Sequence, residues 1–412
     1  MNAPSLHVLF VDDEQAILDG LRNSLRKERK RWEMTFALGG QQALEEMKKT
    51  PADVVITDMR MPGMDGAELL RHIQRDFPAA ARIVLSGQAE RESIMRALPV
   101  THQFLHKPCD GETLRAVIEQ THNLHKLMQN PALTALVGKL ERIPAVPTTY
   151  TELSRLAQDP KADAAMFAKV IEMDAAVCAK VLQLVNSAYF GLGQKIVSIR
   201  PAVTYLGVEI IKSLVLGSTS FSDKAISEVK GFSPDRLQHH SMLTAVLAKK
   251  IVGNPALADA AFTAGLLHDI GALVLLHAAP PDYVRALERK KENGGDSAAA
   301  EREIFGVTHA EVGAYLLGLW GIPFPIVEAV AFHHRPNEVA PESRQLVAAI
   351  HIASGLIEEM TEADAAQRAP GTNIDSSGRI DVSFLRDAGL EESFKKSRAE
   401  AEKLLGKVAD QA

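Results

Sequence analysis

The chain contains 412 residues, of which 46% are hydrophobic and 24% charged, and its formal net charge is −6. This length allows two or three domains with separate cores, and the composition is typical of a globular protein. The mild acidity gives no electrostatic footprint for nucleic acid, so we expect no nucleic-acid partner.

Cysteines and apolar runs indicate the cellular compartment. Cys109 and Cys178, the only cysteines, lie far apart in the sequence, which argues against a disulfide framework and favours a reducing cytoplasm. The amino-terminal end shows no signal-peptide pattern. The longest apolar run, 260–279, contains His268 and Asp269. Because an ionisable pair is costly in mid-bilayer, we predict a buried core helix here and no membrane segment.

The first 125 or so residues alternate apolar runs with amphipathic ones. The predicted strands are 6–11, 34–38, 54–57, 82–86 and 103–106, and the predicted helices are 14–29, 41–48, 67–76, 90–97 and 111–127. Such βα units predict an α/β fold, in which helices cover both faces of a doubly wound, five-stranded parallel sheet.

Polar residues stand where these strands end. Asp12 and Asp13 close the first strand, Asp58 closes the third, Ser86 closes the fourth, and Lys107 follows the fifth. Converging carboxylates repel one another and need a hard divalent cation, which indicates Mg²⁺. With the positive charge of Lys107 and the hydroxyl of Ser86, this set suits phosphoryl transfer to Asp58. Taken alone, Asp58 could equally be a helix-capping residue.

This segment resembles the response-regulator receiver domain. The resemblance rests on Asp12-Asp13, Asp58, Met61-Pro62-Gly63, Asp65-Gly66, Ser86 and Lys107-Pro108. It implies a flavodoxin-like fold for residues 1–127. The alternative is a flavodoxin-like domain in which the acids are incidental.

The resemblance also implies roles for individual residues. Asp58 would accept a phosphoryl group from a sensor histidine kinase or a phosphotransfer protein. Phe104 occupies the position of a switch aromatic that turns inward as Ser86 follows the phosphate. Lys107 would contact the phosphoryl group, and the Lys107–Pro108 peptide bond is expected to be cis. The expected Mg²⁺ ligands are Asp12, Asp13, Asp58 and the backbone carbonyl of Arg60.

Helical patterns occupy most of the remaining chain and predict an all-α domain. We assign residues 128–146 to a helical linker, 147–361 to this domain, and 362–412 to a carboxyl-terminal loop, centred on 369–380, and a helix at 391–408. The apolar stripe of helix 111–127 either belongs to the core or also pairs with a second copy of the chain.

Histidines are spread through the helical region. The candidate ligands are His240, His268, Asp269, His309, His333 and His334. Mixed imidazole and carboxylate ligands suit Fe, Mn or Zn better than Mg. Neighbouring helical residues point about 100° apart, so one ion reaches both His268 and Asp269 only if it lies close to their helix. The alternative is a set of hydrogen-bonded core residues.

Residues 133–360 resemble the HDOD domain, a relative of the HD phosphohydrolases. The segments that carry the resemblance are Asn186-Ser187-Ala188, Ala202-Val-Thr-Tyr-Leu-Gly207 and His268-Asp269-Ile270-Gly271. By this resemblance His240, His268 and Asp269 match metal ligands of catalytic HD enzymes. The positions of His309, His333 and His334 match the additional ligands of HD-GYP phosphodiesterases.

The departures from the catalytic pattern bear on function. Ala272 replaces the lysine expected after the His-Asp pair, Arg335-Pro336-Asn337 stands where Gly-Tyr-Pro would follow, and Ser354 replaces the closing aspartate. We therefore predict a two-component response regulator whose catalytically degenerate HDOD output binds a downstream protein. The alternative is a phosphorylation-regulated, metal-dependent phosphohydrolase acting on cyclic di-GMP or a nucleotide. A DNA-binding output is disfavoured, because no basic helix-turn-helix ends the chain.

Overall fold

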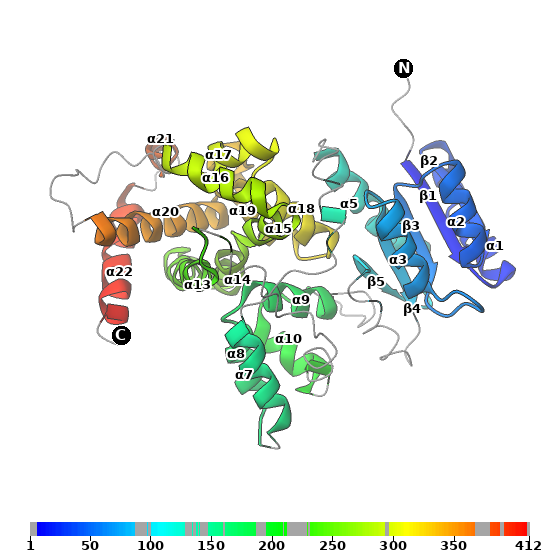
Figure 1. Cartoon of the computed structure of the whole chain (residues 1–412), viewed down its shortest axis with the longest axis horizontal. Helices are drawn as coiled ribbons and strands as arrows, with labels where there is room; N and C mark the ends of the chain where they lie inside the picture. Colours follow the sequence, from blue (N-terminus) through cyan, green and yellow to red (C-terminus); the bar gives the residue numbers. More distant parts are fainter. Residues whose placement is uncertain are drawn as a thin grey trace. The chain divides into compact units, whose positions relative to one another are not determined.

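The computed structural model divides into two compact units, which we describe separately (Figure 1). The first comprises Met1–Arg142, Gln183–Lys195 and Tyr315–Ile322, and the second comprises Ile143–Leu182, Ile196–Ala314 and Pro323–Ala412. The structure describes residues 6–409 except 87–96, 98–99, 128–133, 135–136, 139, 141–146, 160, 187–194, 209, 212–228, 230, 293–295, 367–379 and 388–390.

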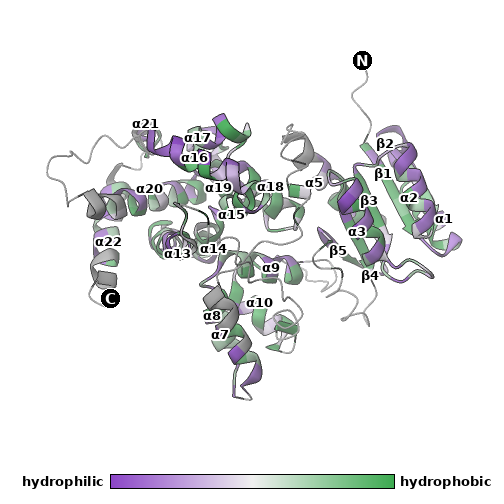
Figure 2. Ribbon diagram, in the orientation of Figure 1, coloured by the Kyte–Doolittle hydropathy of each residue, from purple (hydrophilic) through white to green (hydrophobic). Residues whose placement is uncertain are grey.

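The first unit is built on a parallel sheet of strand order β2-β1-β3-β4-β5. Its strands are β1 (Leu6–Asp12), β2 (Trp32–Leu38), β3 (Val54–Asp58), β4 (Ala81–Ser86) and β5 (Gln103–His106). Every residue of β1, β3 and β4 is buried, as expected for strands covered on both faces. Figure 2 shows β1 and β3 largely in the hydrophobic colour. The predicted α/β fold is confirmed, with strand ends shifted by no more than two residues.

Within the described residues, four helices cover this sheet in two pairs. They are α1 (Gln15–Ser24), α2 (Gly40–Lys49), α3 (Gly66–Asp76) and α5 (Gly111–Leu127). Ser24 of α1 lies against Gly111 of α5, while α2 packs on α3. Because crossovers are right-handed and the strand order reverses at β1, α1 and α2 lie on opposite faces.

The helices predicted at 14–29 and 90–97 differ from the other helix predictions in this unit. The predicted helix 14–29 is interrupted, since α1 ends at Ser24 and a 3₁₀ helix follows at Arg26–Lys30. Between them Leu25 turns its side chain into the core, with only 1% exposed, and its backbone leaves the helical region. The predicted helix 90–97 falls outside the described residues except for Ala97.

The second unit is helical throughout its described residues, as predicted. Its described helices are α7 (Pro147–Gln158), α8 (Ala164–Ile171), α9 (Ala175–Asn186), α10 (Ile199–Leu206), α13 (Pro234–Ile251), α14 (Ala258–Leu267), α15 (Ile270–Ala278), α16 (Pro280–Glu292), α17 (Ser297–Phe305), α18 (His309–Leu319), α19 (Phe324–Phe332), α20 (Arg344–Ala366), α21 (Val382–Asp387) and α22 (Glu391–Ala409). The last residues of α9 and α18 are assigned to the first unit. Short 3₁₀ turns at Pro255–Leu257, Pro336–Glu338 and Pro341–Ser343 connect some of them.

The apolar run 260–279 forms two helices, so the prediction of one continuous helix was wrong. α14 ends at Leu267 and α15 begins at Ile270, with His268 and Asp269 at the junction. The His268 ring contacts the Gly265 carbonyl at 2.7 Å, a side-chain contact that competes with the helical ladder. The stretch Pro255–Ala278 is long and apolar enough to cross a membrane, but 78% of its apolar window is buried in the unit.

The carboxyl-terminal helix packs on the helical core. Ala401 of α22 is fully buried, and Lys250 of α13 lies 3.3 Å from Glu400. The predicted helix 391–408 is therefore confirmed as α22, whereas the predicted loop lies almost wholly outside the described residues. In α5, the predicted stripe includes the buried residues Leu114 and Ile118. Pairing with a second copy stays a prediction.

Candidate functional site

The polar strand ends of the first unit meet at one edge of the sheet. Lys107 extends its amine to 2.9 Å from an oxygen of Asp12 and also forms an ion pair with Asp58. Asp12 and Asp58 are both buried, with 2% and 8% of each residue exposed. The structure thus brings together the carboxylates and the lysine that the sequence singled out.

Burial and charge act in opposite directions on this pair. Burial raises the pKa of Asp58, although Lys107 and the backbone amide of Arg60 favour its ionised form. That amide donates to Asp58 Oδ2 at 2.8 Å. Burial alone would lower the pKa of Lys107, but its contacts with Asp58 and Asp12 raise it. The lysine therefore keeps its charge beside the predicted phosphoryl acceptor.

The turn after β3 is folded tightly against Asp58. Asp65 caps α3 by accepting a hydrogen bond from the Glu68 amide at 2.8 Å. The Gly66 amide donates to the Met59 carbonyl at 2.9 Å. A Cβ on Gly66 would stand 2.2 Å from the Asp58 carbonyl oxygen, so only glycine fits this approach.

The structure also describes the remaining predicted residues of this site. Asp13 is exposed beside buried Asp12, whereas Ser86 and Phe104 are fully buried. The Lys107–Pro108 peptide bond is cis, as the resemblance implied. Asp12 and Asp58 meet at this edge through Lys107, and carboxylate oxygens are the donors that Mg²⁺ prefers, so this pair suits a magnesium ion.

In the second unit, four helical segments bring the six predicted ligands together. His240 comes from α13, His268 and Asp269 from the α14–α15 junction, His309 from the start of α18, and His333-His334 from the end of α19. Ser354 of α20 joins the cluster, because its hydroxyl lies 3.2 Å from His268 Nε2.

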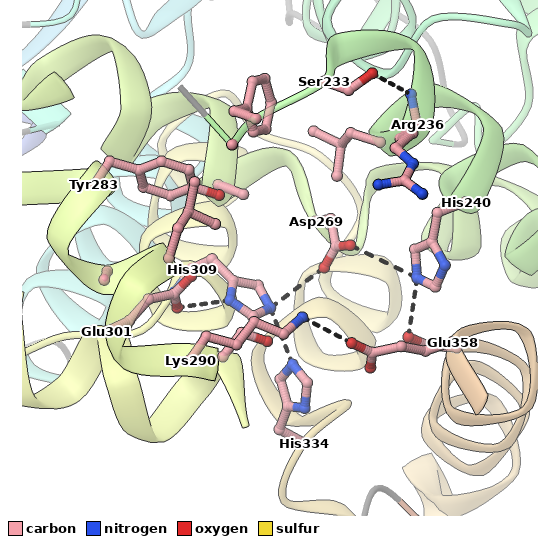
Figure 3. Close-up of a pocket in the computed structure, with 18 residues that line it drawn as sticks. Ser233, Arg236, His240, Asp269, Tyr283, Lys290, Glu301, His309, His334 and Glu358 are labelled. Atoms are coloured by element: carbon pink, nitrogen blue, oxygen red, sulfur yellow. Dashed lines mark hydrogen bonds and ion pairs between the residues drawn. The ribbon is translucent and has the colours of Figure 1, made fainter. Parts of the chain in front are cut away.

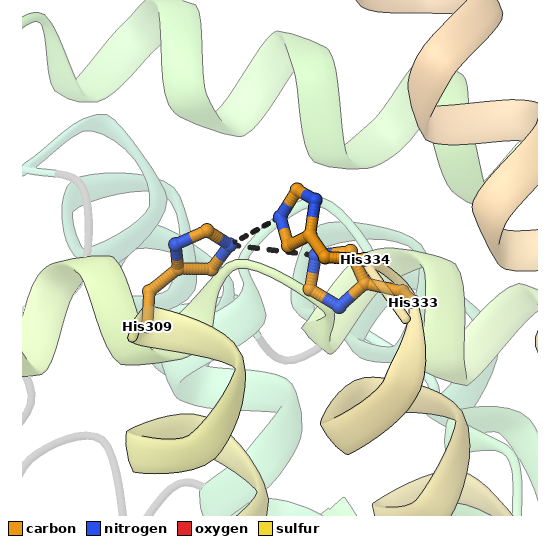
Figure 4. Close-up of side chains that lie close together, drawn as sticks. All are labelled: His309, His333 and His334. Carbon is orange, nitrogen blue, oxygen red and sulfur yellow. Dashed lines mark hydrogen bonds between the residues drawn. The ribbon is translucent and has the colours of Figure 1, made fainter. Parts of the chain in front are cut away.

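The cluster has two halves that share Asp269. In the trihistidine half, His309 Nε2 lies 3.0 Å from His334 Nε2 and 3.4 Å from His333 Nε2 (Figure 4). It also lies 3.3 Å from Asp269 Oδ1. In the serine half, His268 Nε2 lies 3.3 Å from both His240 Nε2 and Asp269 Oδ2.

Second hydrogen bonds fix the tautomers of three rings. The Nδ1 atoms of His268 and His333 lie 2.7 Å from the carbonyls of Gly265 and Val330, and carbonyls can only accept. The Nδ1 of His309 likewise lies 2.6 Å from a Glu301 oxygen. When these rings are neutral, Nε2 therefore carries no proton and exposes a lone pair. The lone pairs of the three rings converge, so they repel one another unless a cation or a proton lies between them.

The separations fit a metal ion in each half. Donors about 2.1 Å from one ion lie about 3–3.5 Å from one another. The three-histidine set and the set of His240, His268 and Asp269 each converge within 4.8 Å. The imidazole-rich donors suit Fe, Mn or Zn, and the residues present fit a transition-metal site.

The electrostatic environment keeps most of these ligands in the form that binds metal. Burial lowers the pKa of His240 to about 4 and holds that of His333 well below its usual range. Burial would raise the pKa of Asp269, but His268 and His309 hold it well below its usual range. Burial would also lower the pKa of His309, but the carboxylates of Glu301 and Asp269 outweigh burial and raise this pKa well above its usual value. An acidic environment around His309 favours a cation there, whether proton or metal.

Two buried residues support the cluster from behind. Glu301 of α17, 4% exposed, accepts from both the backbone amide and the ring of His309. His351 contacts the His333 carbonyl through Nδ1 at 2.6 Å and accepts from the Asp381 amide at 2.9 Å. His351 is therefore a supporting residue and not part of either half. Sequence reasoning missed Glu301, which lies eight residues before His309 in the charged run Glu301-Arg302-Glu303.

A cavity of about 250 Å³ opens above Asp269 (Figure 3). Arg236 and Lys290 line it together with His240, His309 and His334. The Lys290 amine is paired with Glu358 at 2.8 Å. Ala272 also lines the cavity, so its methyl group stands where the resemblance anticipated a lysine. The cavity presents cationic side chains beside the candidate metal ligands.

Comparisons with known proteins agree with both halves of the chain. The family model for the response regulator receiver domain matches residues 8–119, and that for the HDOD domain matches residues 143–336. A protein of Treponema pallidum is 25% identical over 260 residues, covering 60% of this chain and 50% of its own length. The transcriptional regulatory protein YesN of Bacillus subtilis is 35% identical over 121 residues, or 27% of this chain and 31% of YesN. The chain thus spans half or less of these relatives.

Two solved structures that cover most of their own length are also similar to this chain. The MmoQ response regulator from Methylococcus capsulatus has a TM-score of 0.48 at 22% identity, covering 63% of this chain and 98% of that one. A virulence factor from Campylobacter jejuni has a TM-score of 0.48 at 19% identity, with 66% and 98% coverage. Given the two family matches, the chain belongs to the two-component response regulators, with an amino-terminal receiver domain followed by an HDOD domain.

Proposed function

We propose that this chain is a cytoplasmic response regulator in which Asp58 accepts a phosphoryl group from a sensor histidine kinase or a phosphotransfer protein. The observation that carries the proposal is the contact of Lys107 with both Asp12 and Asp58 at the edge of the sheet. A buried carboxylate paired with a fixed cation is suited to nucleophilic attack on phosphorus.

The residues around Asp58 have complementary tasks in this transfer. A carboxylate oxygen of Asp58 attacks phosphorus in line, and the imidazole of the donor leaves. Lys107 then pairs with a phosphoryl oxygen, and Ser86 offers its hydroxyl to another. Mg²⁺ held by Asp12, Asp13, Asp58 and the Arg60 carbonyl would neutralise charge on the transferred group. Exchange of the Asp58–Lys107 pair for contacts with the phosphoryl group would alter the surface of the receiver. Phe104, the expected switch aromatic, is already fully buried here, so the inward turn implied by the resemblance would only retain its present position.

A phosphodonor assay tests this step without knowledge of the kinase. The full chain is incubated with acetyl phosphate and Mg²⁺, and the intact mass is measured. We expect one added phosphoryl group, its loss in Asp58→Asn, and its retention in Asp19→Asn, a partly exposed carboxylate on α1. Equal labelling of Asp58→Asn and the unchanged chain would refute the assignment.

For the output, we propose that the HDOD domain acts by binding a downstream protein. Two features of the cavity support this choice over catalysis: Ser354 supplies no charge to the metal cluster, and Ala272 supplies no phosphate contact. Phosphorylation would then change the availability of a protein-binding surface. Pull-downs with the phosphorylated chain and with Asp58→Ala as control test this output. Identical partner recovery by the two would contradict it.

One observation favours a second candidate, a metal-dependent phosphohydrolase. Arg236 lines the same cavity as the metal cluster, where its guanidinium could bind phosphate oxygens. Lys290 lines the cavity too, with its amine paired to Glu358. Turnover of cyclic di-GMP by the Mn- or Fe-loaded protein, lost in His268→Ala and Asp269→Ala, would establish this activity. If the metal-loaded protein shows no turnover, the phosphohydrolase candidate is refuted and the protein-binding output is the one supported.

A further inference from the structure

The two halves of the metal cluster differ in their donors. The trihistidine half has three imidazoles and one oxygen of Asp269. The serine half has two imidazoles, the other oxygen of Asp269 and the Ser354 hydroxyl, which lies 3.2 and 3.4 Å from the two ring nitrogens. A neutral hydroxyl is a weak ligand for a dication, whereas an imidazole lone pair is a strong one.

The hydrogen bonds that orient the ligand histidines also favour metal binding in the trihistidine half. In the trihistidine half, the carboxylate of Glu301 accepts from the ring of His309 and from its backbone amide, at 2.6 and 2.7 Å. In the serine half, His268 is oriented by the neutral carbonyl of Gly265. A carboxylate behind a histidine orients the ring and increases its basicity, which typically changes metal affinity about 10–100-fold.

Charge balance leads to the same conclusion. The carboxylates within hydrogen-bond or ion-pair distance of the described ligand nitrogens of the trihistidine half are Asp269 and Glu301. Two negative charges balance one divalent ion at this set of ligands, in which His309 and His333 are buried and His334 is exposed. A second dication sharing Asp269 would add uncompensated positive charge close to the first, which is costly away from water.

We propose that the HDOD domain holds one tightly bound transition-metal ion, on His309, His333, His334 and Asp269. In this proposal Ser354 keeps the serine half from holding a second ion comparably tightly, and Glu301 acts as a positioning residue for His309. The proposal rests on the metal centre put forward above and specifies its stoichiometry. The serine half remains an open position beside the cavity.

Cobalt titration of the full chain tests the stoichiometry. The protein is stripped with a chelator and titrated with Co²⁺ in excess Mg²⁺, so that the receiver carboxylates stay filled with Mg²⁺. Bound metal is measured by elemental analysis, and the visible cobalt absorption reports imidazole ligation. We expect one tight equivalent per chain. It should be lost in His334→Ala and kept in His239→Ala, an exposed histidine next to His240 on α13.

Substitution of Ser354 is the decisive variant, because it adds a ligand instead of removing one. Ser354→Asp should bind two tight equivalents, whereas Ser354→Ala should still bind one. Glu301→Gln should weaken the first equivalent about 10–100-fold without changing the number of sites, and Glu301→Asp should recover part of the affinity. Circular dichroism of each variant shows whether it is folded.

The outcomes separate this inference from the metal centre itself. Two equally tight equivalents in the unchanged chain, or a single equivalent in folded Ser354→Asp, would overturn the inferred asymmetry but leave the metal centre standing. Binding of no cobalt by the unchanged chain, even in the absence of Mg²⁺, would overturn both. Unchanged affinity in Glu301→Gln would overturn the positioning role of Glu301.

Discussion

Gly271 of α15 lies directly against the backbone of His309 in α18. A Cβ added to Gly271 would stand 2.0 Å from the His309 carbonyl oxygen and 2.6 Å from the Gly313 amide nitrogen. Because both atoms belong to backbone, neither can move aside as a flexible side chain would. This contact brings Asp269, two residues before Gly271, to the first residue of α18, and so joins the two halves of the cluster.

The first prediction concerns this contact. Gly271→Ala should destabilise the HDOD domain by about 3 kcal/mol or more and weaken metal binding, because it forces α15 and α18 apart. Gly20→Ala is the matched control, since a Cβ there meets nothing within 4 Å. It should be neutral or stabilise the chain by up to about 1 kcal/mol. Urea unfolding with and without metal measures both, and an equally stable Gly271→Ala would contradict the described packing.

The second prediction concerns Lys107. Lys107→Met should slow phosphorylation of Asp58 by about 10–100-fold, the value of a charge-assisted contact. It should also destabilise the receiver, because Asp12 and Asp58 then face each other without a cation. Lys49→Met, which removes a solvent-exposed amine paired with Glu46, is the control.

The loss of unfolding free energy in Lys107→Met should depend on pH, because the pKa of Asp58 is raised in the folded chain. Burial and Asp12 raise the pKa of Asp58, and removing Lys107 leaves both in place. A carboxyl whose folded-state pKa is above its unfolded-state value destabilises the fold when ionised, and the penalty fades as pH falls through the folded-state value. The deficit in unfolding free energy should therefore shrink from about pH 7 towards about pH 5. A deficit that grows in this interval would contradict the electrostatic account.

The third prediction separates two adjacent acids. Asp13→Asn should raise the Mg²⁺ concentration needed for half-maximal phosphorylation by roughly tenfold, because it removes a charged ligand from the edge of the sheet. Glu14→Gln changes the charge of the next exposed residue and should have little effect. Magnesium titrations with acetyl phosphate as donor compare the two. Equal shifts would mean that only the general negative charge matters.

The fourth prediction concerns a buried guanidinium in the receiver. Arg82 is 1% exposed and donates to the carbonyls of Val100 and Ala80 at 2.7 and 3.2 Å. Arg82→Met should cost about 2–4 kcal/mol, since those carbonyls lose their donor in a dry site. Arg75→Met, at an exposed ion pair, should cost under about 1 kcal/mol. Chemical denaturation of the two variants measures the difference, and similar costs would contradict the burial of Arg82.

Much of this architecture could be predicted from the sequence because its signals are local. The run Val54–Thr57 followed by Asp58 marks a buried strand and its end, and parallel strands present such ends at one edge. The contact of Lys107 with Asp58 could therefore be anticipated from topology. The break at His268-Asp269 could not, because the apolar run is otherwise uniform and the contact of the His268 ring with the Gly265 carbonyl appears only in the folded chain.

The support around the histidine cluster was also beyond the sequence. Glu301 and Lys290 look like ordinary surface charges on amphipathic helices, and only tertiary packing places them against His309 and the cavity. Ser354 was anticipated as the residue at the closing ligand position, and its hydroxyl does lie beside His268. What the sequence could not supply was the sharing of Asp269 between two sets of donors.

The measurement that tests the central claim most directly is hydrogen–deuterium exchange on the full chain with and without beryllofluoride, a phosphoryl mimic. The account predicts changed protection in HDOD peptides as well as in the receiver, and no change in Asp58→Asn. Changes confined to receiver peptides, with the HDOD domain identical in both states, would contradict the claim that phosphorylation of Asp58 controls the helical output.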